Sequence, residues 1–375
     1  MKQIDQRISE RMEILRTLLI FGIVLLHVPP ALMASDIGHD PFNLFKYGVS
    51  RGLFRATVPV LTCISGYLLF CDAARFDYRR TVAGKARRIL FPFLLWNVPL
   101  AALLYLIQRA GLLGHDFRLE LVPFDLKVFA DAALALTNAP VNYPLDFLRD
   151  LFVIFLLSPI FLWLIRKAPW IGLLAVAAIF LNDWDGLLIL RSTMPVCFYV
   201  GGMAAVYHWK LDRMDRLWPL ALSALIAASA VIALRGIENV EWFRLLSPPL
   251  VWVAAAPLTG SAVGNWLKRR GSDSFFLFLS HGPVLLATYI AYQMMGEPFP
   301  YPLYWIGAPI LVCATILTIN RGLKQAMPRF AAFLVGDFAR IGVLRDKDGL
   351  AGISAPVDRP GAVKGVFLDN RKGEA

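Results

Sequence analysis

The chain has 375 residues, of which 58% are hydrophobic and 17% are charged, and its mean hydropathy is +0.59. Because a soluble domain is about 45–50% apolar and about 25% charged, this composition excludes a water-soluble fold and predicts an integral membrane protein. What the net charge of +11 implies depends on the side of the bilayer on which the basic residues lie.

Apolar windows of about 20 residues, the length that crosses about 30 Å of hydrocarbon, predict ten transmembrane helices. They cover residues 14–33, 50–70, 89–108, 148–165, 169–182, 188–207, 217–235, 246–264, 274–294 and 302–320. A polar stretch with charges of both signs precedes the first span, and no small-residue cleavage site follows it, so this span is expected to stay as an anchor. The predicted fold class is an all-α membrane protein, a bundle of about ten helices.

The basic residues are distributed unevenly between the two sets of loops. Of the 38 Lys and Arg residues, 21 fall in one alternating set and 10 in the opposite set. Because cytoplasmic loops carry the excess, both termini are expected in the cytoplasm, which requires an even number of spans. The predicted organisation is a cytoplasmic segment over residues 1–13, a transmembrane domain over 14–320 and a mobile, polar cytoplasmic tail over 335–375.

A histidine lies inside the first span, where an ionisable side chain is costly and usually functional. His27 follows Arg16 by eleven positions, which places both on one helix face about 16 Å apart. This spacing suits a base within the membrane that an anionic donor reaches from the cytoplasm. It equally suits an Arg16 that extends to lipid headgroups and a His27 that hydrogen-bonds a neighbouring helix.

A second histidine, His281, lies in the ninth span and is followed by Gly282 and Pro283. This Gly-Pro pair predicts a local break or kink, which membrane helices tolerate where the backbone lines a protein cavity. A structural hydrogen bond is the commoner role of such a histidine, so His281 alone is weak evidence for a site.

The second span carries Arg55 near its start, then Pro59, and then the small pair Ser65 and Gly66. Together these residues predict a helix face turned towards other helices or a cavity. The small pair is also typical of a close contact between two helices without any chemistry.

The loop after the second span is the densest basic stretch of the chain and includes Lys85, Arg87 and Arg88. Arginine clusters bind phosphates through planar, two-pronged hydrogen bonding. Attraction to anionic lipid headgroups explains such a loop equally well, so the cluster indicates a donor site only if a phosphate-bearing donor is expected.

The connection over residues 109–147 faces the opposite side from the termini and is long enough to cover a site. At its end, Asp146 and Arg149 stand three positions apart at the start of the fourth span. That spacing predicts an ion pair on one helix face, which either orients an acceptor or anchors the helix at the interface.

Taken in order, these motifs resemble the acyltransferase-3 family of integral membrane O-acyltransferases, which modify bacterial surface and exported polysaccharides. The family pattern has a basic residue, ten residues and a histidine, then an Arg- and Pro-containing span ending in Ser-Gly-aromatic-Leu-Leu. A basic cluster before an aromatic-Pro span and a late histidine follow. The matching positions are Arg16, His27, Arg55, Pro59, Ser65–Leu69, Lys85–Arg88 and His281. The resemblance covers residues 11–320, and its opening looks most like members that succinylate a rhizobial exopolysaccharide.

The resemblance implies a multi-pass enzyme of the bacterial inner membrane. It would transfer an acyl group, succinyl favoured and acetyl next, from acyl-CoA to a sugar hydroxyl of a lipid-linked exopolysaccharide precursor. Acyl-CoA is then a co-substrate, and no bound cofactor or metal is expected. The residues implied are His27 and Arg16 for catalysis, Lys85, Arg87 and Arg88 for the donor, and Arg55, Ser65, His281, Asp146 and Arg149 for the oxyanion or acceptor.

Two positions depart from the family pattern. Lys85 stands where the basic motif has its first arginine, and Asp146 stands where many members have an aromatic residue. The first weakens two-pronged recognition of phosphate at that position. Asp146 places an acid near the expected acceptor, and the role of this acid is left open.

Other functions remain open on these residues. A transporter or flippase for lipid-linked glycans also has many helices, broken spans and intramembrane charges, although paired half-repeats are not visible here. A non-catalytic subunit of a polysaccharide export assembly would tolerate the loss of His27. The partners expected are the lipid-linked acceptor, membrane lipids and other exopolysaccharide synthesis proteins, and no nucleic acid.

Overall fold

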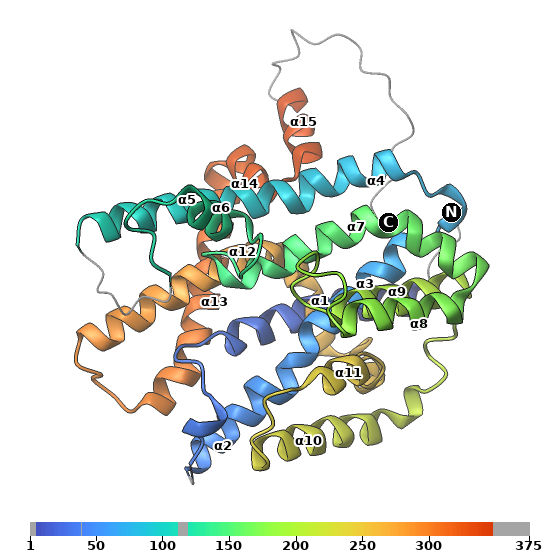
Figure 1. Ribbon diagram of the computed structural model, residues 1–375, viewed down its shortest axis with the longest axis horizontal. Coiled ribbons are helices and arrows are strands. Elements are labelled where there is room, and N and C mark those ends of the chain that lie inside the picture. Colours follow the sequence, from blue (N-terminus) through green and yellow to red (C-terminus); the bar gives the residue numbers. More distant parts are fainter. Residues whose placement is uncertain (1–4, 39, 112–118, 348–375) are drawn as a thin grey trace, which may run out of the picture.

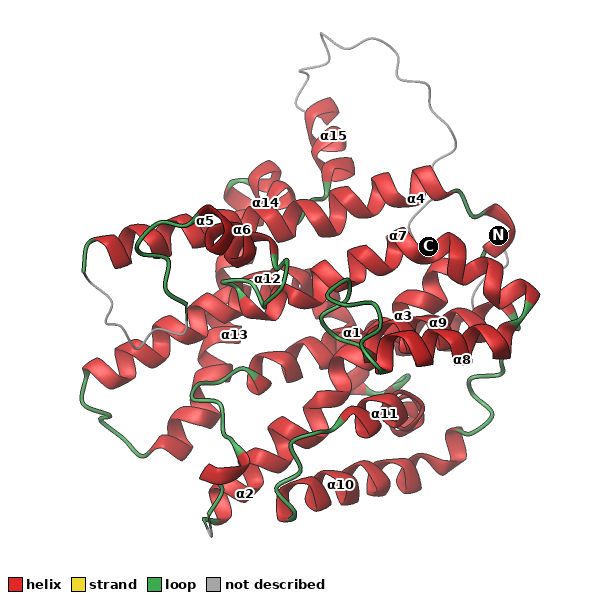
Figure 2. Ribbon diagram, viewed as in Figure 1, coloured by secondary structure: helices red, strands yellow, loops and turns green. Residues whose placement is uncertain are grey.

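The computed structural model describes residues 5–38, 40–111 and 119–347, and every regular element in these ranges is helical (Figure 2). The α-helices are α1 (Gln6–Leu26), α2 (Pro41–Tyr47), α3 (Thr57–Phe70), α4 (Tyr78–Lys85), α5 (Phe91–Arg109), α6 (Leu126–Leu134), α7 (Asp146–Lys167), α8 (Pro169–Leu181), α9 (Thr193–Val206), α10 (Trp218–Leu234), α11 (Glu241–Ala254), α12 (Ala262–Met294), α13 (Tyr301–Ala326), α14 (Pro328–Leu334) and α15 (Phe338–Lys347). The long helices lie side by side in one bundle, from which α15 projects (Figure 1). The main apolar core lies among α1, α3, α7, α9, α12 and α13, which confirms the all-α class for the described residues.

Several helices are long and apolar enough to cross a membrane. Within the described ranges these are Pro41–Phe70, Tyr78–Arg109, Tyr143–Lys167, Asp215–Leu234, Ala262–Met294 and Tyr301–Ala326. Two further apolar helices, α8 and α9, are shorter. Each of the ten predicted spans overlaps a helix, but only these six meet both criteria, so the number ten stays a prediction.

Two predicted spans end earlier than expected. The first was predicted over 14–33, whereas α1 ends at Leu26 because a pair of prolines follows closely. The eighth was predicted over 246–264, whereas α11 ends at Ala254, three residues before Pro257. At the end of α1 a proline, which disfavours helical backbone in the residue before it, ends the helix that hydropathy alone would continue. After α11 the chain tightens into the 3-10 turn Ala256–Leu258, which contains Pro257.

The polar tail was predicted to begin at residue 335. The structure describes a helix, α15, inside it, packed next to α14. Residues 348–375 of the predicted tail lie outside the described residues. The helical part of the chain therefore extends beyond the predicted transmembrane domain.

Helices α3 and α9 pack with their backbones in contact. A Cβ added at Gly66 would lie 2.1 Å from the carbonyl oxygen of Phe198, and one at Gly201 would lie 2.0 Å from that of Cys63. Small residues allow membrane helices to approach this closely. The small residues of the second predicted span therefore form a helix contact, one of the two alternatives drawn from the sequence.

Helix α1 packs along α12, and the two helices run in the same direction. Ile14, near the start of α1, lies against Gly264 near the start of α12, where a Cβ would be 2.9 Å from the Ile14 side chain. At the other end of α1, His27 meets His281 in the middle of α12. This parallel packing brings together two residues that are 254 positions apart in the sequence.

Candidate active site

The two intramembrane histidines are in contact. His27 caps the C-terminal end of α1, and His281 is fully buried in α12. His27 Nδ1 lies 3.2 Å from His281 Nε2, and His281 Nδ1 lies 2.7 Å from the carbonyl oxygen of Phe278. The structure therefore joins the candidate base to the second candidate histidine.

This chain of contacts fixes where the protons lie on neutral imidazoles. A carbonyl oxygen can only accept a hydrogen bond, so His281 Nδ1 must donate to Phe278. With its single proton on Nδ1, His281 presents an acceptor at Nε2, to which His27 Nδ1 donates. The lone pair of a neutral His27 is consequently on Nε2, the nitrogen that can take a proton from a substrate.

The Gly-Pro pair after His281 does not interrupt α12. Of the two predicted alternatives the break is therefore wrong, and the kink stays a prediction. Proline has no backbone N–H, so the carbonyl of Leu279 loses its helical donor, and the side-chain amide of Asn142 donates to that carbonyl at 2.9 Å. Gly282 makes room for this contact, because a Cβ there would lie 2.8 Å from Asn142 Oδ1. Gly282 and Pro283 thus allow Asn142 to pack beside the histidines, and α12 continues through Pro283.

The end of the long 109–147 connection reaches the same place. The hydroxyl of Tyr143 donates to the carbonyl of His27 at 3.1 Å, and the two rings meet edge to face. The backbone N–H of Asn142 donates to Asn97 Oδ1 at 3.1 Å. These three neighbours were not among the predicted site residues; the one signal for them was Asn97, an amide inside the third apolar span.

A small cleft lies next to the end of α1. Three arginines, Arg55, Arg191 and Arg244, line it together with Leu26 and other side chains, and its volume is about 10 Å³, room for about one water molecule. Arg55 lies in a short 3-10 turn, Leu53–Ala56, that joins a π-helical turn to α3. The candidate Arg55 is therefore brought close to the histidines, with two arginines from other elements.

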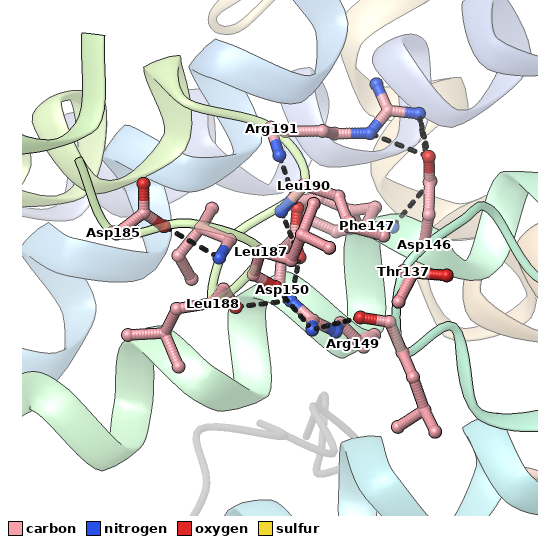
Figure 3. Close-up of polar contacts among 12 residues, drawn as sticks. Thr137, Asp146, Phe147, Arg149, Asp150, Asp185, Leu187, Leu188, Leu190 and Arg191 are labelled. Carbon is pink, nitrogen blue, oxygen red and sulfur yellow. Dashed lines mark hydrogen bonds and ion pairs between the residues drawn. The ribbon is translucent and has the colours of Figure 1, made fainter. Parts of the chain in front are cut away.

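An acid at the start of α7 holds one of these arginines. Asp146 accepts two-pronged hydrogen bonds from Arg191, with the closest pair of atoms 2.6 Å apart (Figure 3). The predicted ion pair between Asp146 and Arg149 is therefore wrong. Arg191, 45 positions along the chain, takes that place with its planar fork, whereas Arg149 pairs with Asp150.

Arg149 instead fastens the loop that carries Arg191. It pairs with Asp150 at 2.9 Å and donates to the carbonyls of Leu187 and Leu188 (Figure 3). Asp150, fully buried, also accepts the backbone N–H groups of Leu190 and Arg191. The start of α7 thereby fixes the loop between α8 and α9, and Arg149 acts on the site through that loop.

The basic residues predicted for the donor lie together beside Arg16, at the middle of α1. The positive charges of Arg16 and Arg88 both act on Lys85, whose ammonium lies 4.2 Å from the ring centre of Phe155. The side chains of Arg16, Arg87 and Arg88 are exposed. This basic surface is separated from His27 by about 16 Å along α1.

Ser65 is the candidate that the structure does not bring to the histidines. Its hydroxyl donates to the carbonyl of Leu61 within α3 at 2.8 Å, next to the close contact with α9. Within the described residues, moreover, no group of three or more His, Cys, Asp or Glu side chains is placed to hold a metal ion.

Comparison with known proteins identifies a family and a relative. Residues 9–320 match the acyltransferase domain of the acyltransferase-3 family. The chain is 31% identical over 346 residues to the succinoglycan biosynthesis protein ExoH of Rhizobium meliloti (strain 1021), a match that covers 88% of this chain and 93% of that protein. No solved structure matches the chain. The histidines, the cleft and the basic surface all lie within residues 9–320, and the resemblance drawn from the motifs is confirmed.

Proposed function

We infer the function of this chain from its family, because the chain belongs to the acyltransferase-3 family. We propose that it transfers an acyl group from acyl-CoA to a sugar hydroxyl of a lipid-linked exopolysaccharide precursor in the bacterial inner membrane. Succinyl is the favoured acyl group and acetyl the next. The observation that carries this proposal is the pair of histidines that leaves His27 Nε2 unprotonated within the bundle.

His27 is the general base of the proposed reaction. Its Nε2 takes the proton of the acceptor hydroxyl as the hydroxyl oxygen forms a bond to the thioester carbonyl carbon, a step worth about 10²–10⁴ in rate. The carbon–sulfur bond of the donor then breaks, and the proton passes from His27 to the departing thiolate. His281 and the Phe278 carbonyl hold the ring in the required tautomer throughout.

The basic surface beside the middle of α1 is proposed to bind the phosphates of the donor. Arg16, Lys85 and Arg88 place three positive charges close together there, and Arg87 is exposed on the same turn of helix as Arg88. Guanidinium groups suit phosphate oxygens through charge-assisted hydrogen bonds. The extended arm of the donor would then bridge the distance of about 16 Å to the base.

A strain that lacks this gene, complemented with wild type or His27→Ala at matched expression, tests the proposal. Mass spectrometry of its exopolysaccharide should show one acyl ester restored by wild type and lost in His27→Ala, because the base is removed. The mass of the ester names the acyl group. His208→Ala is the matched control, since His208 is an exposed histidine away from the site.

Two results would contradict the proposal. Full acylation by a His27→Ala protein that accumulates normally in the membrane would show that His27 is not the general base. Unchanged acylation in the deletion strain, with shortened or unexported polymer, would favour a transporter instead.

A further inference from the structure

The cleft lined by Arg55, Arg191 and Arg244 is a second feature of the site, distinct from the hydrogen-bonded pair of histidines. It lies beside the base, because Leu26, the residue before His27, lines it. Phe54, which also lines it, packs so closely on α1 that a Cβ at Gly22 would lie 2.4 Å from its ring. The charges of Arg55 and Arg191 both act on His27. A group bound in the cleft would therefore belong to a substrate that reacts at His27.

The cleft carries an excess of positive charge. Arg191 is paired with Asp146, and Arg244 is paired with Glu241. Arg55 has no such partner: its Nε is enclosed and has no hydrogen-bond partner among the described residues. The positive charges of Arg244 and Arg191 also act on Arg55, and the negative charge of Asp146, which Arg191 already holds, offsets them in part. Two ion pairs and one unpaired guanidinium leave the cleft with a net positive charge.

An unpaired charge beside other cations in a membrane protein is costly. The cost is relieved by an anion that accepts a hydrogen bond from the unpartnered Nε–H of Arg55. A guanidinium offers its donors in a planar fork, which matches a carboxylate. The cleft has room for about one water molecule, so among the anions that match a guanidinium fork we expect the smaller one, a carboxylate, and not a diphosphate.

We propose that the cleft binds the terminal carboxylate of a dicarboxylic acyl group, with Arg55 as the residue that recognises it. This inference rests on the proposed acyl transfer, and it specifies the class of acyl donor. The acyl carbonyl is at His27 while the far carboxylate of the same short chain is held by Arg55. A donor without that carboxylate leaves Arg55 unpaired and binds less well.

Two acyl-CoA donors that differ in the carboxylate test this inference. Membrane vesicles from the deletion strain, complemented with each variant, are supplied with labelled succinyl-CoA or butyryl-CoA, and the label entering polysaccharide is measured. Wild type should prefer succinyl-CoA. Arg55→Gln should lower the ratio of kcat/KM for succinyl-CoA to that for butyryl-CoA by about 10- to 100-fold, as for the loss of a hydrogen bond to a charged group.

Arg51→Gln is the matched control, because Arg51 precedes Arg55 by one turn and donates to the sulfur of Met33. It should leave the ratio near the wild-type value. If Arg55→Gln fails to accumulate, Arg55→Lys carries the test: lysine keeps the charge but loses the fork, so the ratio should fall.

The outcomes separate this inference from the proposed function. An equal effect on both donors, or an unchanged ratio in the Arg55 variant that accumulates, would overturn the carboxylate site while leaving acyl transfer in place. Equal use of the two donors by wild type would do the same. Transfer from neither donor by a wild-type protein that restores the acyl ester in the complementation test would overturn the carboxylate site alone. Loss of that ester as well would overturn the proposed function and this inference with it.

Discussion

His281 determines which nitrogen of His27 is available for chemistry. Replacing it by leucine removes the acceptor for His27 Nδ1, so the proton of His27 is no longer confined to that nitrogen. We expect His281→Leu to lower kcat by about 10- to 100-fold, as for loss of a partner that orients a functional histidine. The donor KM should be unchanged, because the basic surface is distant.

A conservative variant distinguishes positioning from a role in folding. The amide oxygen of glutamine can accept the same hydrogen bond, so His281→Gln should recover part of the lost kcat in the vesicle assay. Equal activity of the His281→Leu variant and wild type would contradict the claim that His281 fixes the tautomer of His27. Equal loss in both variants with less protein in the membrane would assign His281 to stability.

The sequence identified the residues whose chemistry conflicts with an apolar span. His27, His281 and Arg55 are ionisable groups in such spans, and the cost of burying them marked them out. Arg191 was missed because nothing near it in the chain indicates that Asp146 binds it from another helix. The pairing expected for Asp146 was wrong for the same reason: local spacing predicts local partners, and a better partner came from elsewhere.

The contact between α3 and α9 makes a prediction at the scale of helices. Gly66→Ala would place a methyl group 2.1 Å from the carbonyl oxygen of Phe198, so the two helices would have to separate. Such overpacking costs about 1–3 kcal/mol. The variant should lower the free energy of unfolding by that amount, measured by unfolding in detergent.

The control for this variant is Gly307→Ala in α13. A Cβ at Gly307 has open space around it, and alanine favours a helix more than glycine does. It should leave stability unchanged or slightly raised. Equal stability of the two variants would show that the close approach of α3 and α9 is not tight.

Helix type along a span was beyond what hydropathy could predict. The second span was expected as a plain helix over residues 50–70, whereas a π-helical turn, Gly48–Gly52, and the 3-10 turn that carries Arg55 precede α3. Gly52 lies against Ser229 of α10, where a Cβ would be 2.7 Å from the Ser229 side chain. The irregular turns thus lie at a contact between segments distant in the sequence, and the local sequence pattern does not predict such a contact.

For the whole molecule, the distribution of charge predicts the topology. Both termini are expected in the cytoplasm and the 109–147 connection on the opposite side, because 21 basic residues lie in one set of loops and 10 in the other. A fluorescent protein fused to the C-terminus should fold and fluoresce. Alkaline phosphatase inserted into the connection should be active.

The opposite pattern, an inactive phosphatase in the connection, would overturn this topology. In the bundle, helices α1 and α12 run in the same direction, as expected of the predicted first and ninth spans. The helical class and the site helices were therefore accessible from hydropathy and charge, while the depth of each helix depends on the packing of its neighbours.

The close contacts described for two helix pairs also bear on how the protein moves. Backbones that touch, as in α3 and α9, leave little room for sliding, so each pair should move as a unit. The parallel pair α1 and α12 carries both histidines, whereas α3 and α9 follow directly the turns that carry Arg55 and Arg191. The two pairs meet where Phe54 packs on Gly22, so a motion that separated them would also move the base away from the anion site.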